Sequence, residues 1–197
     1  MRVSACLALC LLLILLPVLV CATTITGKVV KVVDGDTLDV FQDRQTVRIR
    51  LNGIDAPESG QAYGKKAKQF VLELAAQKMV KVEVFEKDRY GRSVGDVILP
   101  DGRNLNREIV KAGYAWWFRK YSQDQSLGRL EEEARLARRG LWQDRNPVAP
   151  WDWRKMKRHS NQPNKDFSEE TKNGLKSTSL TRKATDFSMP GFPVAFS

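Results

Sequence analysis

The segment of residues 48–58, R-I-R-L-N-G-I-D-A-P-E, places the strongest constraint on the fold. From residue 47 to residue 51 apolar side chains alternate with arginines, which is typical of a strand with one buried face. Gly53 interrupts the alternation and loosens the backbone. Asp55 and Glu58 follow at once, beside the strand that carries Arg50. The sequence therefore predicts a sheet edge where two acids and an arginine meet.

Two further turns carry charges of the same kinds. Asp34 and Asp36 flank a glycine between two β-branched runs, a pattern that predicts a tight turn between strands. The segment of residues 88–92, D-R-Y-G-R, brings Arg92 through a second glycine turn. These turns and the end of the Arg50 strand could meet at one end of a sheet.

Short strands separated by Gly or Asp turns are typical of a small closed or nearly closed barrel. The expected strands are residues 24–33, 37–41, 46–54, 79–85 and 94–99. Apolar residues at helical spacing predict three helices, at residues 64–76, 105–112 and 126–139. We therefore expect one α+β domain, over residues 23–147.

The two ends of the chain differ from this domain in composition. An apolar run from residue 5 to residue 22 ends at a small-residue site, which favours a signal peptide cleaved after Ala22. An uncleaved membrane anchor and a lipid-modified Cys21 are the alternatives. In all three cases the folded part lies outside the cytoplasm, secreted or periplasmic.

Residues 148–197 are basic and poor in Leu, Ile and Val, so we expect a disordered tail. Within it, the aromatic and basic patch of residues 151–158 either covers the domain edge or touches nucleic acid or membrane.

The distribution of cysteine and histidine excludes much chemistry. All three cysteines lie within residues 1–22, and the one histidine, His159, lies in the predicted tail. The domain thus has no disulfide, no Cys or His nucleophile system and no zinc site with Cys or His ligands. Carboxylates, guanidiniums, hydroxyls and a hard metal ion remain. The net charge of +10 favours a polyanionic partner such as nucleic acid.

Together these motifs resemble the thermonuclease (staphylococcal nuclease-like, SNase) family. The resemblance covers residues 24–142 and adds the Q-A-Y-G sequence of residues 61–64 and the G-L-W sequence of residues 140–142. It implies a five-stranded OB-fold barrel with about three helices, and an endonuclease that cleaves DNA and RNA with Ca²⁺ and leaves 3′-phosphates. It implies no stable protein partner, and we expect a monomer, with membrane contact only if the N-terminal segment is retained. A binding module on the same fold that does not cut nucleic acid is the alternative, although such copies lose part of the acid and arginine set.

The resemblance also implies a role for each site residue. Asp36, Asp55 and the backbone carbonyl of Ala56 would bind the metal. Glu58 would be the general base, and Arg50 and Arg92 would bind the phosphate as catalytic residues. Ala56 replaces the threonine that is frequent in the family, which leaves the main-chain ligand in place. The loop of residues 59–62 is short, whereas members of the family with longer loops contact the substrate there. Three aromatic residues are candidates for contact with the substrate, namely Tyr90, Tyr114 and Trp117.

This assignment agrees with the chemistry of phosphodiester hydrolysis. Carboxylates suit a hard divalent cation such as Ca²⁺, which orients a water and neutralises developing charge. A glutamate beside that water can accept its proton. The planar guanidinium of an arginine can bind two phosphate oxygens at once, which a lysine cannot do.

Overall fold

The computed structural model describes residues 23–160. The chain divides between Arg154 and Lys155 into two compact units. All strands of the described residues lie in the first unit, and the last described helix crosses the division. The predicted signal peptide and residues 161–197 of the predicted tail lie outside the described residues.

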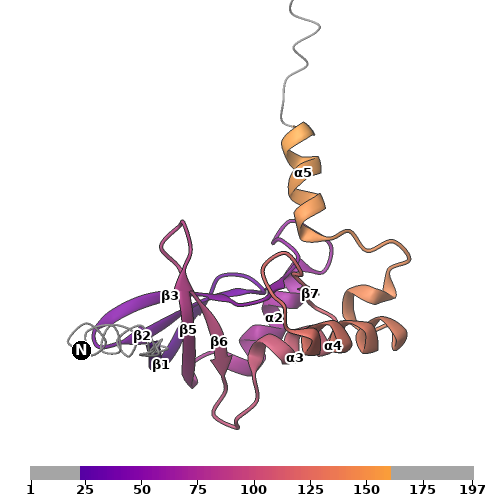
Figure 1. The fold of residues 1–197 in the computed structure, drawn as a ribbon. Coiled ribbons are helices and arrows are strands. Elements are labelled where there is room, and N and C mark those ends of the chain that lie inside the picture. Colours follow the sequence, from indigo (N-terminus) through magenta and orange to yellow (C-terminus); the bar gives the residue numbers. More distant parts are fainter. Residues whose placement is uncertain (1–22, 161–197) are drawn as a thin grey trace, which may run out of the picture. The chain divides into compact units, whose positions relative to one another are not determined.

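Five strands close into a barrel in the first unit (Figure 1). Their order around the barrel is β1-β2-β3-β6-β5, and β5 pairs with β1 to complete the ring. β3 and β6 are parallel, and every other neighbouring pair is antiparallel. This barrel confirms the predicted α+β class and the five-stranded, OB-like architecture. The strand bounds are Thr23–Val32 (β1), Thr37–Gln42 (β2), Gln45–Leu51 (β3), Met79–Lys87 (β5) and Ser93–Ile98 (β6).

A second, two-stranded sheet carries the acidic end of the segment at residues 48–58. β4 (Ile54–Asp55) pairs antiparallel with β7 (Trp116–Trp117). The strand predicted at residues 46–54 is therefore two strands, because the backbone turns at Gly53, where φ is +73°. A side chain at this position would be strained at that φ and would also contact Leu127. The turn leads the chain from β3 into β4, where Asp55 pairs with Trp116 of β7.

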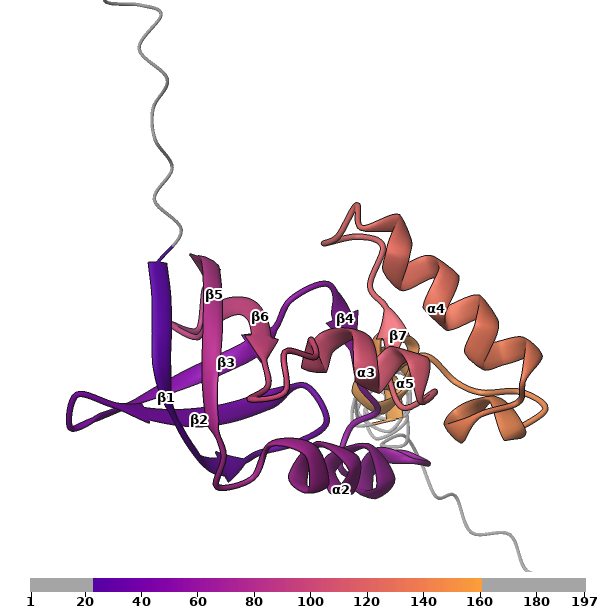
Figure 2. The same ribbon diagram turned by 90° about the horizontal axis from the view of Figure 1, so that it is seen from below.

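The three predicted helices are present, as α2 (Gly64–Ala75), α3 (Leu105–Lys111) and α4 (Gln125–Leu136). Two of them, α2 and α3, pack against the barrel. α3 contacts both β6 and α4, so it lies between the barrel and α4 (Figure 2). Side-chain caps explain two helix starts: Asn104 accepts a hydrogen bond from the N–H of Arg107, and Asp124 accepts one from Ser126. A short 3-10 helix follows at Gly140–Gln143.

The apolar side chains form two clusters. The larger one fills the barrel and continues under α2 and α3, and Leu38, Ile49, Val82, Val71 and Ile109 are among its fully buried members. The smaller one lies around the tryptophan pair Trp116 and Trp142, whose ring centroids are 4.4 Å apart. Trp116 is a residue of β7, so the smaller cluster supports the strand that pairs with β4.

The structure differs from the sequence prediction at residues 150–160, which form α5 (Pro150–Ser160) and not an unstructured segment. Pro150 occupies the first helical position, where its fixed φ favours a helix and its missing N–H costs nothing. Trp151 packs against the smaller apolar cluster, with its ring stacked on Phe118 at a centroid distance of 5.3 Å. This packing stabilises a helix that the polar composition did not predict. Over residues 23–160, no helix has the length and apolar character needed to cross a bilayer.

Candidate active site

The turn between β1 and β2 holds Asp36 in a buried position. The backbone N–H of Asp36 donates to the Oδ1 atom of Asp34 at 3.0 Å, which fixes the tight turn predicted from the sequence. The Oδ1 atom of Asp36 accepts a hydrogen bond from the Thr37 hydroxyl at 3.0 Å. Its Oδ2 atom accepts one from the backbone N–H of Ala56 at 2.8 Å. This last bond joins the turn to the segment that follows β4.

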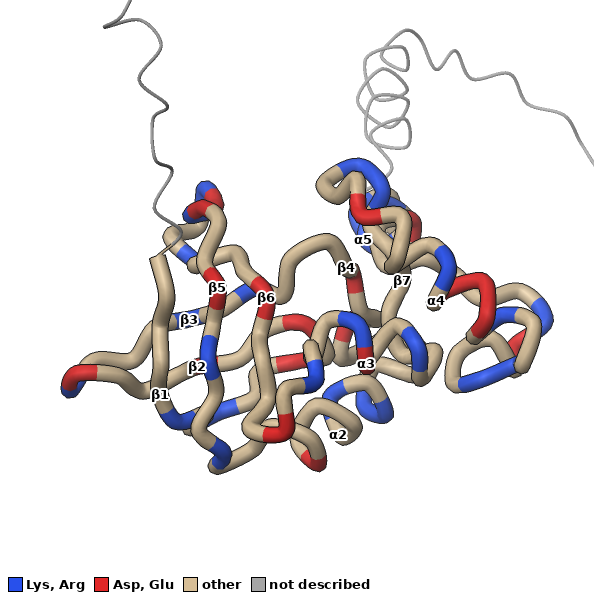
Figure 3. The backbone as a smooth tube through the Cα atoms, turned by 60° about the horizontal axis from the view of Figure 1, so that its bottom comes forward, with Lys and Arg blue, Asp and Glu red and all other residues tan. Residues whose placement is uncertain are grey.

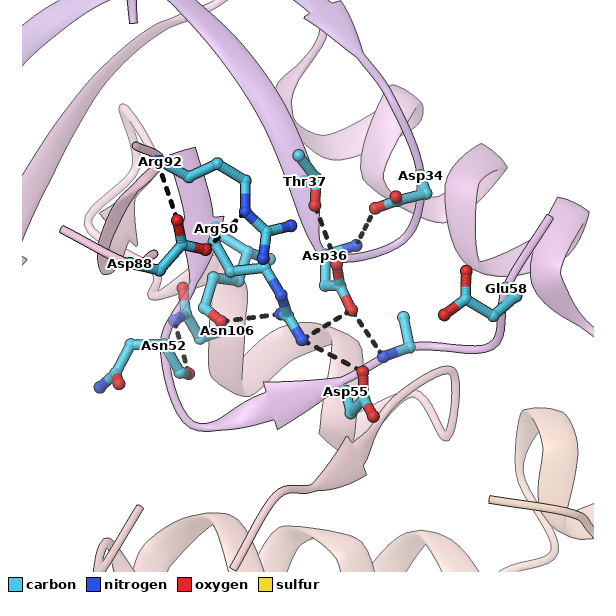
Figure 4. Close-up of polar contacts among 12 residues, drawn as sticks. Asp34, Asp36, Thr37, Arg50, Asn52, Asp55, Glu58, Asp88, Arg92 and Asn106 are labelled. Carbon is cyan, nitrogen blue, oxygen red and sulfur yellow. Dashed lines mark hydrogen bonds and ion pairs between the residues drawn. The ribbon is translucent and has the colours of Figure 1, made fainter. Parts of the chain in front are cut away.

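Arg50 brings the two predicted metal-binding aspartates together (Figure 4). Its Nη2 atom lies 3.2 Å from the Oδ2 atom of Asp36 and 3.1 Å from the Oδ1 atom of Asp55. Its Nη1 atom donates to the carbonyl of Leu51 at 3.0 Å, which fixes the plane of the guanidinium. Both carboxylates are buried, and the side chain of Asp55 is only 2% exposed. One nitrogen therefore bridges two buried acids from separate turns.

Glu58 extends from the loop after β4, and its carboxylate points toward this group (Figure 4). Its side chain is 42% exposed, so water reaches it. The loop is held by Gln61, whose Oε1 atom accepts from the N–H of Glu58 at 3.2 Å and whose N–H donates to the Glu58 carbonyl at 2.8 Å. A Cβ at Gly64 would collide with that same carbonyl. The loop therefore requires glycine at residue 64, the first residue of α2.

Arg92 comes from the hairpin between β5 and β6, on the other side of the group from Glu58 (Figure 4). Asp88 orients it, because the Asp88 Oδ2 atom accepts from Arg92 Nε at 2.7 Å. Burial opposes ionisation of Asp88, but the hydrogen bonds from Arg92 and from the Tyr90 N–H outweigh it and lower the Asp88 pKa below 3.8. Arg92 also lines a surface hollow of about 340 Å³ together with Tyr90 and Arg48.

The three predicted aromatic contacts have different surroundings. Tyr90 is 68% exposed beside Arg92, whose guanidinium carbon lies 5.5 Å from the ring centroid. Tyr114 is half-buried and packs on Phe70, with ring centroids 5.4 Å apart. Trp117 packs against the main core, and its ring lies so close to Gly128 that a Cβ there would clash. Tyr90 therefore lies exposed beside Arg92, whereas Tyr114 and Trp117 pack against the main core.

A third arginine, which was not predicted from the sequence, reaches the acids. Arg154 of α5 lies in the first unit. Its Nη2 atom is 2.7 Å from the Oδ2 atom of Asp55, and its Nη1 atom is 2.7 Å from the Oε1 atom of Glu58. A sequence signal does exist, because Pro150 marks a helix start and Trp151 and Arg154 are three residues apart, on one helix face.

Burial and the neighbouring charge of Asp36 raise the pKa values of two acids at the site. Burial raises the pKa of Asp34 to about 6, and the nearby charge of Asp36 adds to the effect. Burial also raises the pKa of Asp55, and the charge of Asp36 adds to it, although the hydrogen bonds from Arg154 oppose the rise. A cation beside these carboxylates would favour their charged forms.

The donor set fits a hard divalent cation. Asp36 and Asp55 offer carboxylate oxygens, which suit Ca²⁺ or Mg²⁺ and not a metal that prefers sulfur or imidazole. In the part of the chain that the structure describes, no three Asp, Glu, His or Cys side chains are yet gathered closely enough to enclose an ion. Arg50 and Arg154 occupy oxygens of the acids instead.

The comparisons with known proteins agree with this geometry. Residues 48–144 match the family model described as Staphylococcal nuclease homologue. An uncharacterized endonuclease of Escherichia coli O157:H7 is 50% identical over 133 residues, which are 68% of this chain and 87% of that relative. A micrococcal nuclease of Shigella flexneri is 44% identical over 144 residues, covering 68% of this chain and 83% of that protein. A probable staphylococcal-like nuclease of Oryza sativa subsp. japonica is 46% identical over 112 residues, but the match covers only 34% of its length. The chain therefore belongs to the staphylococcal nuclease-like family and is a nuclease.

Proposed function

We propose that this nuclease is a secreted, calcium-dependent endonuclease that hydrolyses phosphodiester bonds of DNA and RNA and leaves 3′-phosphates. One observation carries the proposal: Arg50 bridges the buried carboxylates of Asp36 and Asp55, and Glu58 faces the same group. These are the acids and the arginine that hydrolysis of a phosphate diester needs, and they come from separate turns that the fold brings together.

Asp36, Asp55 and the carbonyl of Ala56 would hold the cation. When bound, Ca²⁺ supplies positive charge beside the scissile phosphate and orients a water molecule. The burial that raises the Asp55 pKa also supports this role, since a desolvated carboxylate gains much from a cation. Arg50 keeps both carboxylates in place before the cation arrives.

Glu58 accepts the proton of the attacking water. Its carboxylate is partly exposed, so it is accessible to water, and the Gln61 hydrogen bonds hold its backbone in one position. General-base catalysis of this kind typically contributes about 10²–10⁴-fold in rate. The proton leaves the water as its oxygen bonds to phosphorus. The bond from phosphorus to the leaving 5′ sugar oxygen breaks, and that oxygen takes a proton from solvent water to become a hydroxyl.

Arg50 and Arg92 stabilise the negative charge that grows on the phosphate oxygens. Asp88 binds the Nε of Arg92, which orients its guanidinium fork toward the site. Fixed donors of this kind stabilise a transition state by about 3–4 kcal/mol each. Tyr90, exposed beside Arg92, offers a face on which a base can stack.

The basic charge of the chain favours binding of a long polyanion. The net charge is +10. Lys and Arg residues are spread over the barrel and the helices among Asp and Glu residues, and no one element carries the whole excess (Figure 3). Such a distribution supports contacts with phosphates along a strand and little selection of sequence.

Digestion under control of a chelator tests the proposal. The purified full-length protein is incubated with linear DNA or with RNA, in Ca²⁺ or in excess EGTA, and the ends of the products are identified by their response to a 3′-phosphatase. We expect internal cutting of both polymers with Ca²⁺, 3′-phosphate ends, and no cutting with EGTA. Full-rate cutting in EGTA would refute the metal role, and 5′-phosphate ends would refute the proposed bond cleavage. Fractionation of the native host tests secretion, because the protein should be found outside the cytoplasm.

A further inference from the structure

Arg154 occupies the carboxylate oxygens that the proposed metal and base roles require. Both oxygens of Asp55 are engaged: Oδ2 accepts from Arg154 Nη2 at 2.7 Å, and Oδ1 accepts from Arg154 Nη1 at 3.3 Å and from Arg50 at 3.1 Å. Arg154 Nη1 also donates to Glu58 Oε1 at 2.7 Å. The guanidinium therefore holds the predicted metal ligand and the predicted base at the same time.

Packing and hydrogen bonds hold the segment before Arg154 against the site. The contact of Arg154 with Asp55 and Glu58 is therefore supported by the backbone that carries Arg154. Trp151, one turn earlier in α5, stacks on Phe118 with an angle of 5° between the rings. The side chain of Gln61 donates to the carbonyl of Val148 at 2.6 Å and accepts from the N–H of Glu58 at 3.2 Å. The same glutamine thus links the Glu58 loop to the approach of α5.

The burial of Asp55 makes its ion pair with Arg154 strong enough to compete with a bound cation. The Asp55 side chain is 2% exposed and that of Arg154 is 38% exposed, so the pair lies at the edge of a buried region. Ion pairs there are weakened less by solvent than pairs at the surface. A carboxylate oxygen bonded to a guanidinium has less free electron density for a cation, and a positive charge next to a divalent ion repels it.

We propose that Arg154 is a built-in counter-ion that must leave Asp55 and Glu58 before a divalent cation binds, and that it thereby sets the affinity of the site for that cation. This inference rests on the proposed function, in which Asp55 binds the cation. It assigns to Arg154 a role within the active site. In the cation-free protein Arg154 stabilises the acids, and in the loaded protein Glu58 is released to accept a proton.

Calcium titration by isothermal calorimetry without nucleic acid tests the inference on the full-length protein. We compare the wild type with Arg154→Gln, which removes the charge, and with Arg154→Lys, which keeps the charge but loses the two-nitrogen fork. Arg129→Gln is the control, because Arg129 is an exposed arginine on α4. We expect Arg154→Gln to bind Ca²⁺ about tenfold more tightly than the wild type. Arg154→Lys should lie between the two, and the control should match the wild type. Equal or weaker binding by Arg154→Gln overturns the inference.

Thermal unfolding gives a second readout that needs no catalysis. In EDTA we expect Arg154→Gln to melt below the wild type, because Asp55 loses its partner. In saturating Ca²⁺ this difference should close, since Arg154 no longer pairs with Asp55 in either protein. A difference that stays the same in saturating Ca²⁺ would show that Arg154 remains on the acids, and it would overturn the inference.

The two proposals fail in different ways. Tighter Ca²⁺ binding by Arg154→Gln in a protein that cuts no nucleic acid would refute the proposed function and support the inference. A wild type that cuts nucleic acid with Ca²⁺, but binds Ca²⁺ with the same affinity as Arg154→Gln, would support the proposed function and refute the inference. If Ca²⁺ binds to neither protein, the calcium role and the counter-ion role fail together.

Discussion

The Oδ2 atom of Asp36 accepts a hydrogen bond from the backbone N–H of Ala56 at 2.8 Å, across a separation of 20 residues. The bond is buried at both ends, and it holds the β1–β2 turn against the end of β4. Two acids that are distant in the sequence are thereby fixed on either side of Arg50. The site is therefore part of the fold, and substitutions in it should change both stability and activity.

Glu58→Gln separates catalysis from structure. Glutamine retains the Oε1 atom that accepts from Arg154, but it cannot accept a proton from water. We expect kcat to fall by about 10²–10⁴-fold, with the affinity for nucleic acid unchanged. Single-turnover digestion and fluorescence anisotropy measure the two quantities, and Glu132→Gln on the exposed face of α4 is the matched control. Loss of binding together with rate would contradict a general-base role.

Arg50→Ala should destabilise the cation-free protein, because it leaves two buried carboxylates facing each other. Removal of one partner from a buried ion pair costs about 3–5 kcal/mol. We expect a loss of that size in EDTA and a smaller loss in saturating Ca²⁺, where the cation replaces the missing charge. Urea unfolding followed by tryptophan fluorescence measures the free energy of unfolding in both conditions. An equal loss in the two conditions would show that the cation does not bind between Asp36 and Asp55.

Asp88→Asn should lower the free energy of unfolding by an amount that depends on pH. The Asp88 pKa is lowered in the folded protein, so this carboxylate stabilises the fold above its ordinary value of 3.8, and the stabilisation is lost as the pH falls through the lowered pKa. At pH 7 we expect the variant to be less stable by about 1 kcal/mol, the upper range for a partly exposed pair. The difference should shrink below pH 3.8. A difference that is constant with pH would contradict an ionic contribution.

The sequence predicted the parts of the site that local patterns determine. The turn at Asp34 and Asp36 is specified by its own glycine, and the alternation before Gly53 determines which face of β3 carries Arg50. Arg154 was not predicted, because α5 is placed by the packing of Trp151 on Phe118, a contact between residues far apart in the chain. The packing of Tyr114 and Trp117 could not be predicted for a similar reason. An aromatic residue can face a cleft or the core, and only the packing neighbours decide which.

Asn106→Ala tests a buried polar contact that supports both the fold and the turn before Asp55. The Oδ1 atom of Asn106 accepts from the N–H of Val97 at 3.1 Å, and its Nδ2 atom donates to the carbonyls of Asn52 and Gly95 at 3.0 and 3.2 Å. Alanine leaves a buried N–H without a partner, which costs about 1–3 kcal/mol, and opens a cavity in addition. We expect a total loss of about 3 kcal/mol by urea unfolding. The exposed Asn146→Ala should lose less than about 0.5 kcal/mol. Because Asn52 lies next to the turn that precedes Asp55, we expect the Ca²⁺ affinity of Asn106→Ala to fall together with its stability. Unchanged stability would contradict the role given to the Asn106 side chain.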